Sequence, residues 1–195
     1  MRIAICGGTF DPIHRGHIEP LLAVRDKMQW DHILYIPAWR QPFKTGKATT
    51  SGYHRMAMIA LAIRDHDILF AVPIELERGG TSYSVDTLEE LRSLYPGAEF
   101  DWIIGDDNVP QLMEWKDPAR LFELARFVVL SRVGGGQPPP AVPPGRIVFA
   151  ENATVPISST QIRNKVRAGE PIDSLVDPLV SRYIHHNGLY EEGHS

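Results

Sequence analysis

The stretch RIAICGGTFDPIHRGHIEP, residues 2–20, joins an apolar run to two glycines and then to two histidines. The apolar run predicts a strand that ends at Gly7 and Gly8. Proline is tolerated in the first turn of a helix, where its missing N–H group would be unbonded anyway. Pro20 therefore predicts a helix that begins a few residues earlier, with Gly16 and His17 at its N-terminus.

The turn between this strand and this helix has the features of an anion site. Unpaired N–H groups and the helix dipole favour negative charge at a helix N-terminus, and glycines let a phosphate approach the backbone closely. His14 lies in the turn and His17 at the helix start, so both imidazoles are expected near the carboxyl end of the strand. The stretch predicts a polyphosphate site.

Two other interpretations of the histidine pair stay open. Zinc would need a third ligand, and no cysteine or nearby histidine supplies it. The histidines can also be structural, with their ring nitrogens bonded inside the fold. The motifs GxGxxG and GxxxxGK[ST] are absent, so the stretch is neither a dinucleotide fingerprint nor a Walker P-loop.

The rest of the chain alternates strand-like runs with helical patterns. The strand-like runs are almost continuously apolar, as expected for strands buried on both faces. We expect strands at 3–6, 33–36, 68–72, 100–104, 127–130 and 147–149, and helices near 18–28, 52–64, 84–95, 106–125 (broken at Pro118), 159–168 and 177–187. This order predicts an α/β fold: a Rossmann-like, doubly wound parallel sheet with helices on both faces and a small C-terminal helical part at 157–190. Such sheets bind ligands at the carboxyl ends of their strands.

The composition is that of one globular domain over residues 1–195, with 43% hydrophobic and 23% charged residues. The single cysteine, Cys6, excludes a disulfide framework and a cysteine-based zinc site. A signal peptide and a membrane-spanning run are not found, so we expect a cytoplasmic protein. The net charge of −4 argues against a nucleic-acid partner.

Two loops stand out by composition. Residues 39–52 contain Arg40, Lys44 and Lys47 among turn-forming residues, without an apolar stripe. This pattern predicts a mobile segment that closes over a triphosphate through Lys44. Residues 134–145, GGGQPPPAVPPG, predict an exposed connector.

The stretch PISSTQIRNKVRAG, residues 156–169, predicts a second anion site. Ser158 and Gln161 match a capping box, so a helix begins here. Ser159 and Thr160 can offer hydroxyl groups from its first turn, and Arg163 lies one turn beyond Ser159 on the same face. Together they can hold a phosphate chain. A well-capped surface helix is the alternative interpretation.

These two stretches, GGTFDPIHRGH and ISSTQIR, resemble the motifs of the HxGH nucleotidylyltransferase superfamily. More narrowly, the chain is similar to the bacterial nicotinate mononucleotide adenylyltransferases from Arg2 to about Tyr190. Further landmarks follow in order: IPAWRQPFK ending at Lys44, GYHRMAMIALA with Arg55, ELERGGTSYSVDTLEEL around Tyr83 and Thr87, IIGDDNVPQLMEW with Gly105, Asp107 and Trp115, and YIHHNGLY. Ser84, Lys116 and Val133 stand where the family usually has threonine, an aromatic residue and proline.

The resemblance implies an enzyme that moves AMP from ATP to nicotinate mononucleotide, with release of pyrophosphate, in NAD biosynthesis. The acceptor's 5′-phosphate attacks the α-phosphorus directly, and Mg²⁺ is carried by the ATP phosphates, without a protein metal site. For catalysis the resemblance implies His14, His17, Lys44 and Arg163. For ATP it implies Gly7, Gly8, Thr9, Phe10, Gly105, Asp107, Ile157, Ser159 and Thr160, and for the acceptor Ser84, Thr87, Trp115, Lys116 and Arg132.

The preference for nicotinate is predicted from TSYSVDTLEEL, residues 81–91. Ser84 and Asp86 are expected to cap a helix whose first N–H groups face the acceptor's carboxylate, with Asp86 turned toward the helix start or solvent. A sibling enzyme that uses nicotinamide mononucleotide or phosphopantetheine remains an alternative, as does a nucleotide-binding module without turnover. The sequence also leaves a homo-oligomer open.

Overall fold

The computed structural model describes residues 1–42, 50–131, 139–151 and 155–191. In these residues six parallel strands form one sheet in the order β3-β2-β1-β4-β5-β6. The strands are β1 (Arg2–Gly8), β2 (His32–Pro37), β3 (Leu69–Ala71), β4 (Glu99–Gly105), β5 (Ala125–Ser131) and β6 (Ile147–Glu151). The predicted doubly wound α/β fold is confirmed, because the order runs outward from β1 in one direction and from β4 in the other.

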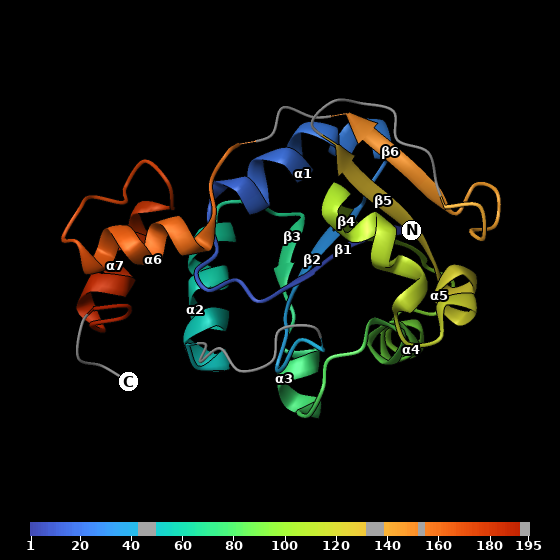
Figure 1. The fold of residues 1–195 in the computed structure, drawn as a ribbon, viewed down its shortest axis with the longest axis horizontal. Coiled ribbons are helices and arrows are strands. Elements are labelled where there is room, and N and C mark those ends of the chain that lie inside the picture. Colours follow the sequence, from blue (N-terminus) through green and yellow to red (C-terminus); the bar gives the residue numbers. More distant parts are fainter. Residues whose placement is uncertain (43–49, 132–138, 152–154, 192–195) are drawn as a thin grey trace.

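Helices follow the strands and cover the sheet (Figure 1). They are α1 (Arg15–Met28), α2 (Gly52–Ile63), α3 (Ile74–Arg78), α4 (Ser84–Leu94), the 3₁₀ helix η1 (Asp106–Glu114), α5 (Pro118–Leu124), α6 (Ser159–Arg167) and α7 (Pro178–His186). In Figure 1 α6 and α7 lie beside α2, at the end of the molecule away from α5. The predicted C-terminal helical part therefore consists of α6, α7 and the turns around them.

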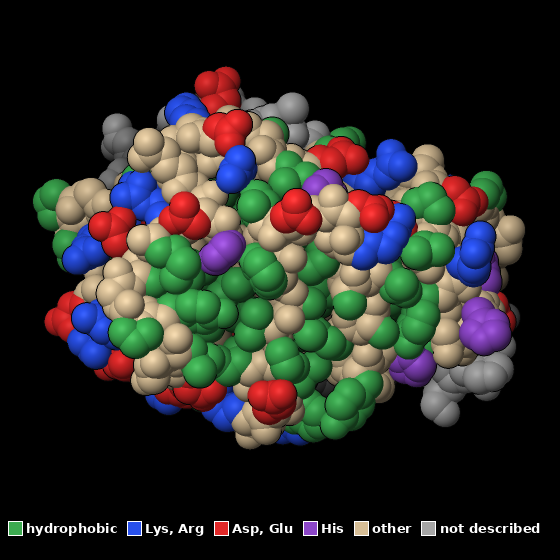
Figure 2. Space-filling model, turned by 180° about the vertical axis from the view of Figure 1, so that it is seen from behind, with side chains coloured by type: hydrophobic (Ala, Val, Ile, Leu, Met, Phe, Trp, Pro, Cys, Tyr) green, Lys and Arg blue, Asp and Glu red, His purple; other side chains and the backbone are tan. Residues whose placement is uncertain are grey.

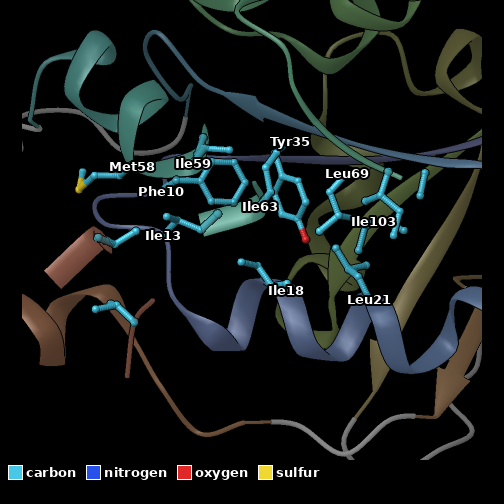
Figure 3. Close-up of a cluster of buried hydrophobic side chains, with 14 of the residues drawn as sticks. Phe10, Ile13, Ile18, Leu21, Tyr35, Met58, Ile59, Ile63, Leu69 and Ile103 are labelled. Atoms are coloured by element: carbon cyan, nitrogen blue, oxygen red, sulfur yellow. The ribbon is translucent and has the colours of Figure 1, made fainter. Parts of the chain in front are cut away.

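Alternate residues of each central strand enter two different hydrophobic clusters. Ala4 of β1 belongs to the first cluster, with residues of α1, α2, α6 and α7. Ile3 and Ile5 belong to the second cluster, with residues of α3, α4, η1 and α5. Figure 3 shows part of the first cluster, in which Ile18 and Leu21 of α1 point toward Tyr35 of the sheet. Both faces of the sheet are buried, which explains the almost continuously apolar strands in the sequence.

Three expectations about helices are wrong in detail. Residues 106–114, expected as α-helix, form a 3₁₀ helix that contains Pro110. The break at Pro118 is confirmed: Asp117 has a φ of 50° and its side chain caps α5. Pro20 is the sixth residue of α1 and lies beyond the first turn. The short helix α3 was not expected at all, since five residues carry little periodicity.

The molecular surface mixes charges of both signs. On the face shown in Figure 2, hydrophobic side chains gather in the middle, and lysine and arginine alternate with aspartate and glutamate nearer the rim. No helix among the described residues is both long and apolar enough to span a membrane.

Candidate functional site

A cleft opens where the strand order reverses, between the carboxyl ends of β1 and β4. Its volume of about 2190 Å³ exceeds the roughly 300–1,000 Å³ of a usual small-molecule pocket. The cleft therefore has room for two nucleotides. Of the residues predicted for the site, these line it: Gly7, Gly8, Thr9, Phe10, His14, His17, Ser84, Gly105, Asp107, Trp115, Lys116, Ile157, Ser159, Thr160 and Arg163.

The turn after β1 (residues 8–14, the phosphate turn) depends on the two glycines of the sequence motif. A Cβ atom on Gly7 would lie 3.0 Å from the ring of Trp102, and one on Gly8 would lie 3.0 Å from the ring of Phe10. Phe10 itself has a φ of 51°, which turns the chain back toward α1. The glycines thus let two aromatic rings close against the backbone.

The two histidines stack on each other at the start of α1. Their ring centroids are 3.7 Å apart, and the planes differ by 25°. The backbone N–H group of His14 donates to Nδ1 of His17 over 3.2 Å. A neutral His17 ring then carries its proton on Nε2, which makes Nε2 a hydrogen-bond donor. The predicted juxtaposition of the two imidazoles at one end of the cleft is what the structure shows.

His14 is the more buried of the pair, with an exposed fraction of 6%. Burial lowers the pKa of His14 to about 4, so its ring is neutral at pH 7. Its Nδ1 atom and the hydroxyl of Thr9 have no hydrogen-bond partner within the described parts of the chain. A Cβ atom on Gly16 would lie 3.0 Å from that Nδ1 atom and 3.2 Å from the carbonyl oxygen of Val155. Glycine at position 16 is therefore needed to seat His14.

The second motif is bonded directly to the phosphate turn. Ser158 caps α6 as predicted, because its side chain accepts from the N–H group of Gln161. The hydroxyl of Ser159 donates to the carbonyl oxygen of Pro12 over 2.9 Å. The guanidinium of Arg163 donates to the carbonyl oxygen of Asp11 over 2.7 Å. Two stretches about 150 residues apart in the sequence thus form one site.

Arg163 and Thr160 are also joined to each other. Nη2 of Arg163 donates to the hydroxyl of Thr160 over 3.1 Å. A guanidinium has five N–H donors, and the bonds to Asp11 and Thr160 use two of them. The side chain can therefore hold the turn and still bind an anion.

Arg55 of α2 is a part of this region that the sequence motifs identified only as a family landmark. It is 2% exposed, and it donates to the carbonyl oxygens of Thr9, Ala38 and Thr50 over 2.7, 2.7 and 2.9 Å. These bonds tie the phosphate turn to the chain after β2 and to residue 50. A sequence signal existed, since Arg55 lies three and four residues before the buried Met58 and Ile59 and so on the buried face of α2.

The opposite side of the cleft is formed by the start of α4. Its N-cap is Tyr83, which makes no side-chain capping bond, so the expectation that Ser84 and Asp86 cap this helix is wrong. Ser84 is instead the first helical residue, and the cleft reaches it. Asp86 is paired with Lys116, whose ammonium lies 2.8 Å from the carboxylate and 4.7 Å from the ring centroid of Tyr83.

Thr87 does not line the cleft. It is fully buried, and its hydroxyl donates to the carboxylate of Glu75 over 2.6 Å while accepting from Arg78 over 2.8 Å. Desolvation raises the pKa of Glu75, which is itself buried beside the cleft. Thr87 therefore links α4 to α3 through these two hydrogen bonds.

Trp115 and Asp107 lie at the end of η1 and at its start. Trp115 is half-buried, with its ring edge-on to Phe127 at a centroid distance of 6.1 Å, and it also lines the cleft. Asp107 folds back over Gly105, where a Cβ atom would lie only 2.6 Å from its carboxylate. A side chain at position 105 would therefore displace the exposed carboxylate of Asp107 from its present position.

Lys44 and Arg132 fall outside the described residues, as do Lys47 and the rest of 43–49, which is half of the predicted mobile loop. Their predicted roles stay predictions. Within the described segments no three histidine, cysteine, aspartate or glutamate side chains gather into a group that could hold a metal ion.

Known proteins match this chain in sequence and in fold over nearly its whole length. The cytidylyltransferase-like family matches residues 5–165, which include both phosphate motifs. A protein of Gemmatimonas aurantiaca named "Probable nicotinate-nucleotide adenylyltransferase" is 39% identical, over 98% of this chain and 93% of its own. A protein of the same name from Streptomyces coelicolor is 35% identical, over 94% and 98% of the two chains. The fold matches that of a Plasmodium falciparum nicotinic acid mononucleotide adenylyltransferase complexed with NaAD, with a TM-score of 0.77, 21% identity and 97% coverage of both chains.

Proposed function

We propose that this chain, which belongs to the cytidylyltransferase-like family, is a nicotinate-nucleotide adenylyltransferase that moves AMP from ATP to nicotinate mononucleotide and releases pyrophosphate. Relatives that carry this name align with nearly the whole chain at 35–39% identity. The product, nicotinate adenine dinucleotide, makes this a step of NAD biosynthesis. The enzyme is thus a nucleotidyltransferase.

One observation carries the proposal: the starts of α1, α4 and α6 all open into the same cleft. A helix N-terminus favours a negative charge. Joining ATP to nicotinate mononucleotide brings together a triphosphate, an attacking phosphate and a carboxylate. Three such helix starts match these anionic groups.

The reaction is a direct displacement. An oxygen of the acceptor's 5′-phosphate forms a bond to the α-phosphorus of ATP, and the bond from that phosphorus to the β-phosphate oxygen breaks. Catalysis then depends on positioning and on donors aimed at the charge that develops on the leaving pyrophosphate. Nε2 of His17, the guanidinium of Arg163 and the N–H groups of α1 are the donors that we assign to this task, with Lys44 as a further cation.

His14 has a different role in this proposal. Its neutral ring lines the cleft and stacks on His17 at the start of α1. Two protonated imidazoles with centroids 3.7 Å apart would repel each other. A neutral His14 avoids this repulsion, and His17 keeps the form in which Nδ1 accepts from the backbone and Nε2 donates.

The acceptor's carboxylate is bound, in our proposal, by the first N–H groups of α4. Tyr83 leaves these N–H groups without a side-chain cap, so they can donate hydrogen bonds to an anion. Lys116 neutralises Asp86, which would otherwise repel a carboxylate. Trp115 can contact the pyridine ring from the other wall of the cleft.

We further propose that Mg²⁺ enters as part of the Mg·ATP substrate. Mg²⁺ in nucleotide sites is commonly held by substrate phosphates with few protein carboxylates. Since ATP is the donor, we assign the reaction to the cytoplasm.

The proposal is tested by product analysis. The purified protein is incubated with Mg·ATP and nicotinate mononucleotide, and the dinucleotide and pyrophosphate are quantified by chromatography and a coupled assay. We expect equal amounts of both products, and neither when one substrate is omitted. Release of phosphate with ADP, or absence of the dinucleotide, would overturn the assignment.

A further inference from the structure

The phosphate turn receives a hydrogen bond from a residue close to the other end of the described chain. The hydroxyl of Tyr190 donates to Oδ1 of Asp11 over 2.7 Å, across 179 residues of sequence. Tyr190 is not among the residues that line the cleft. It can therefore influence the reaction through its neighbours, above all through Asp11 of the phosphate turn.

The backbone directs Tyr190 toward this contact. Tyr190 has a φ of 68°, in the left-handed region that bulky residues rarely occupy and hold only when their surroundings fix them. The chain before it is fixed by backbone bonds from Gly188 to His185 and from Leu189 to Ile184. The ring packs against the first hydrophobic cluster. The hydroxyl thus reaches Asp11 from a well-defined position.

Asp11 joins three segments of the chain at one carboxylate. Its side chain is 6% exposed and also accepts from the N–H group of Thr50 over 3.3 Å. Its own carbonyl oxygen accepts from Arg163. Burial and the nearby Asp11 carboxylate raise the pKa of Tyr190, so its hydroxyl keeps its proton at neutral pH and remains a donor.

We propose that Tyr190 is a positioning residue for adenylyl transfer: by holding Asp11, it fixes the phosphate turn against which the triphosphate of ATP binds. The inference rests on the proposed function, and it concerns ATP rather than the acceptor. Without this donor the buried carboxylate of Asp11 loses a hydrogen bond, and the turn that carries Phe10 and His14 is less firmly positioned.

The test removes one hydroxyl group at a time. Tyr190→Phe deletes the bond to Asp11 and keeps the ring. Tyr183→Phe is the matched control, because its hydroxyl is bonded to Nδ1 of His54 over 2.8 Å and its ring packs against the same cluster. Both variants lose one hydroxyl of the α7 region, but only the first loses a bond to the phosphate turn.

Three quantities are measured for both variants and the wild type: kcat and KM for each substrate, the Kd of a nonhydrolysable ATP analogue by calorimetry, and the free energy of unfolding in urea. A hydrogen bond to a charged group corresponds to about a tenfold change or more in affinity. We expect Tyr190→Phe to weaken analogue binding and kcat/KM for ATP about tenfold, with the acceptor's KM within about twofold. Tyr183→Phe should match the wild type in binding and kinetics. Its loss of unfolding free energy should be similar to that of Tyr190→Phe.

The inference is overturned if Tyr190→Phe behaves like Tyr183→Phe, or if it weakens ATP and acceptor equally in step with a loss of stability. It is also overturned if the wild type does not bind the ATP analogue. If the wild type binds the analogue but forms no dinucleotide, the proposed function fails while calorimetry still decides the role of Tyr190.

Discussion

The two sides of the cleft differ in how their polar groups are held. On the phosphate side, His14 is 6% exposed, and Ser159, Arg163 and Arg55 are bonded to carbonyl oxygens of the phosphate turn and its neighbours. On the acceptor side, Lys116 and Asp86 form an ion pair whose side chains are 48% and 37% exposed. Donors that stabilise developing charge must be fixed in advance, whereas backbone amides of a helix start can bind a carboxylate beside exposed side chains. Substitutions should therefore cost much more on the phosphate side.

The largest effect is expected for His17→Ala. Loss of one preorganised donor lowers turnover about 10²–10³-fold, or roughly 2.7–4 kcal/mol. We expect kcat to fall by this factor while the KM of the acceptor changes little. Steady-state kinetics with both substrates measures this, with His186→Ala as the control, since His186 is an exposed histidine of α7. Turnover within threefold of the wild type would remove His17 from the mechanism.

The next effect concerns stability and pH. The pKa of His14 is lowered to about 4 in the folded protein, from an ordinary value near 6.5. The unfolded chain therefore binds more protons than the folded protein between these pH values. The free energy of unfolding thus increases as the pH rises from about 4 to 6.5, and this gain disappears as the pH falls back toward 4. We expect the wild type to gain roughly 3 kcal/mol more than His14→Gln between pH 4 and 7, because one pKa unit corresponds to about 1.4 kcal/mol.

Urea unfolding of both proteins at several pH values measures this difference. The two curves of unfolding free energy against pH should diverge mainly between pH 4 and 6.5. Parallel curves would show that His14 is not desolvated in the folded protein.

The smallest effect is expected on the acceptor side. Exposed ion pairs contribute about 0–1 kcal/mol, so Lys116→Ala should raise the KM of nicotinate mononucleotide by no more than about threefold. The double variant Asp86→Ala with Lys116→Ala should lie closer to the wild type, because it also removes the unpaired carboxylate. A tenfold rise in both variants would mean that Lys116 itself binds the acceptor, and the contrast between the two sides would fail.

The sequence predicted best what depends on short-range patterns. All six strands and the starts of α2, α4 and α6 follow from apolar periodicity and from turn residues. The two anion motifs were predicted separately, and the resemblance assigned residues of both to ATP; the structure shows that α6 is bonded to the phosphate turn. The 3₁₀ form of residues 106–114 was missed, because apolar periodicity does not distinguish so short a 3₁₀ helix from an α-helix.

The contacts that support the site were harder to predict, since their partners are distant in sequence. Arg55 bonds three carbonyl oxygens from separate segments, and the identity of those partners appears only after folding. The bond from Tyr190 to Asp11 has no local signal at all. The departures at Ser84 and Lys116 both lie on the side of the cleft where we propose that backbone N–H groups bind the acceptor.

The choice of acceptor tests the central claim most directly. Pyrophosphate release is measured at saturating ATP with nicotinate mononucleotide, nicotinamide mononucleotide and phosphopantetheine offered separately. A charge-assisted hydrogen bond contributes about 1.5–3 kcal/mol, so kcat/KM for the nicotinate substrate should exceed that for the nicotinamide one by at least about tenfold, with no turnover of phosphopantetheine. Equal values of kcat/KM, or a preference for the amide, would contradict recognition of the carboxylate by the start of α4 and leave only the adenylyltransferase class.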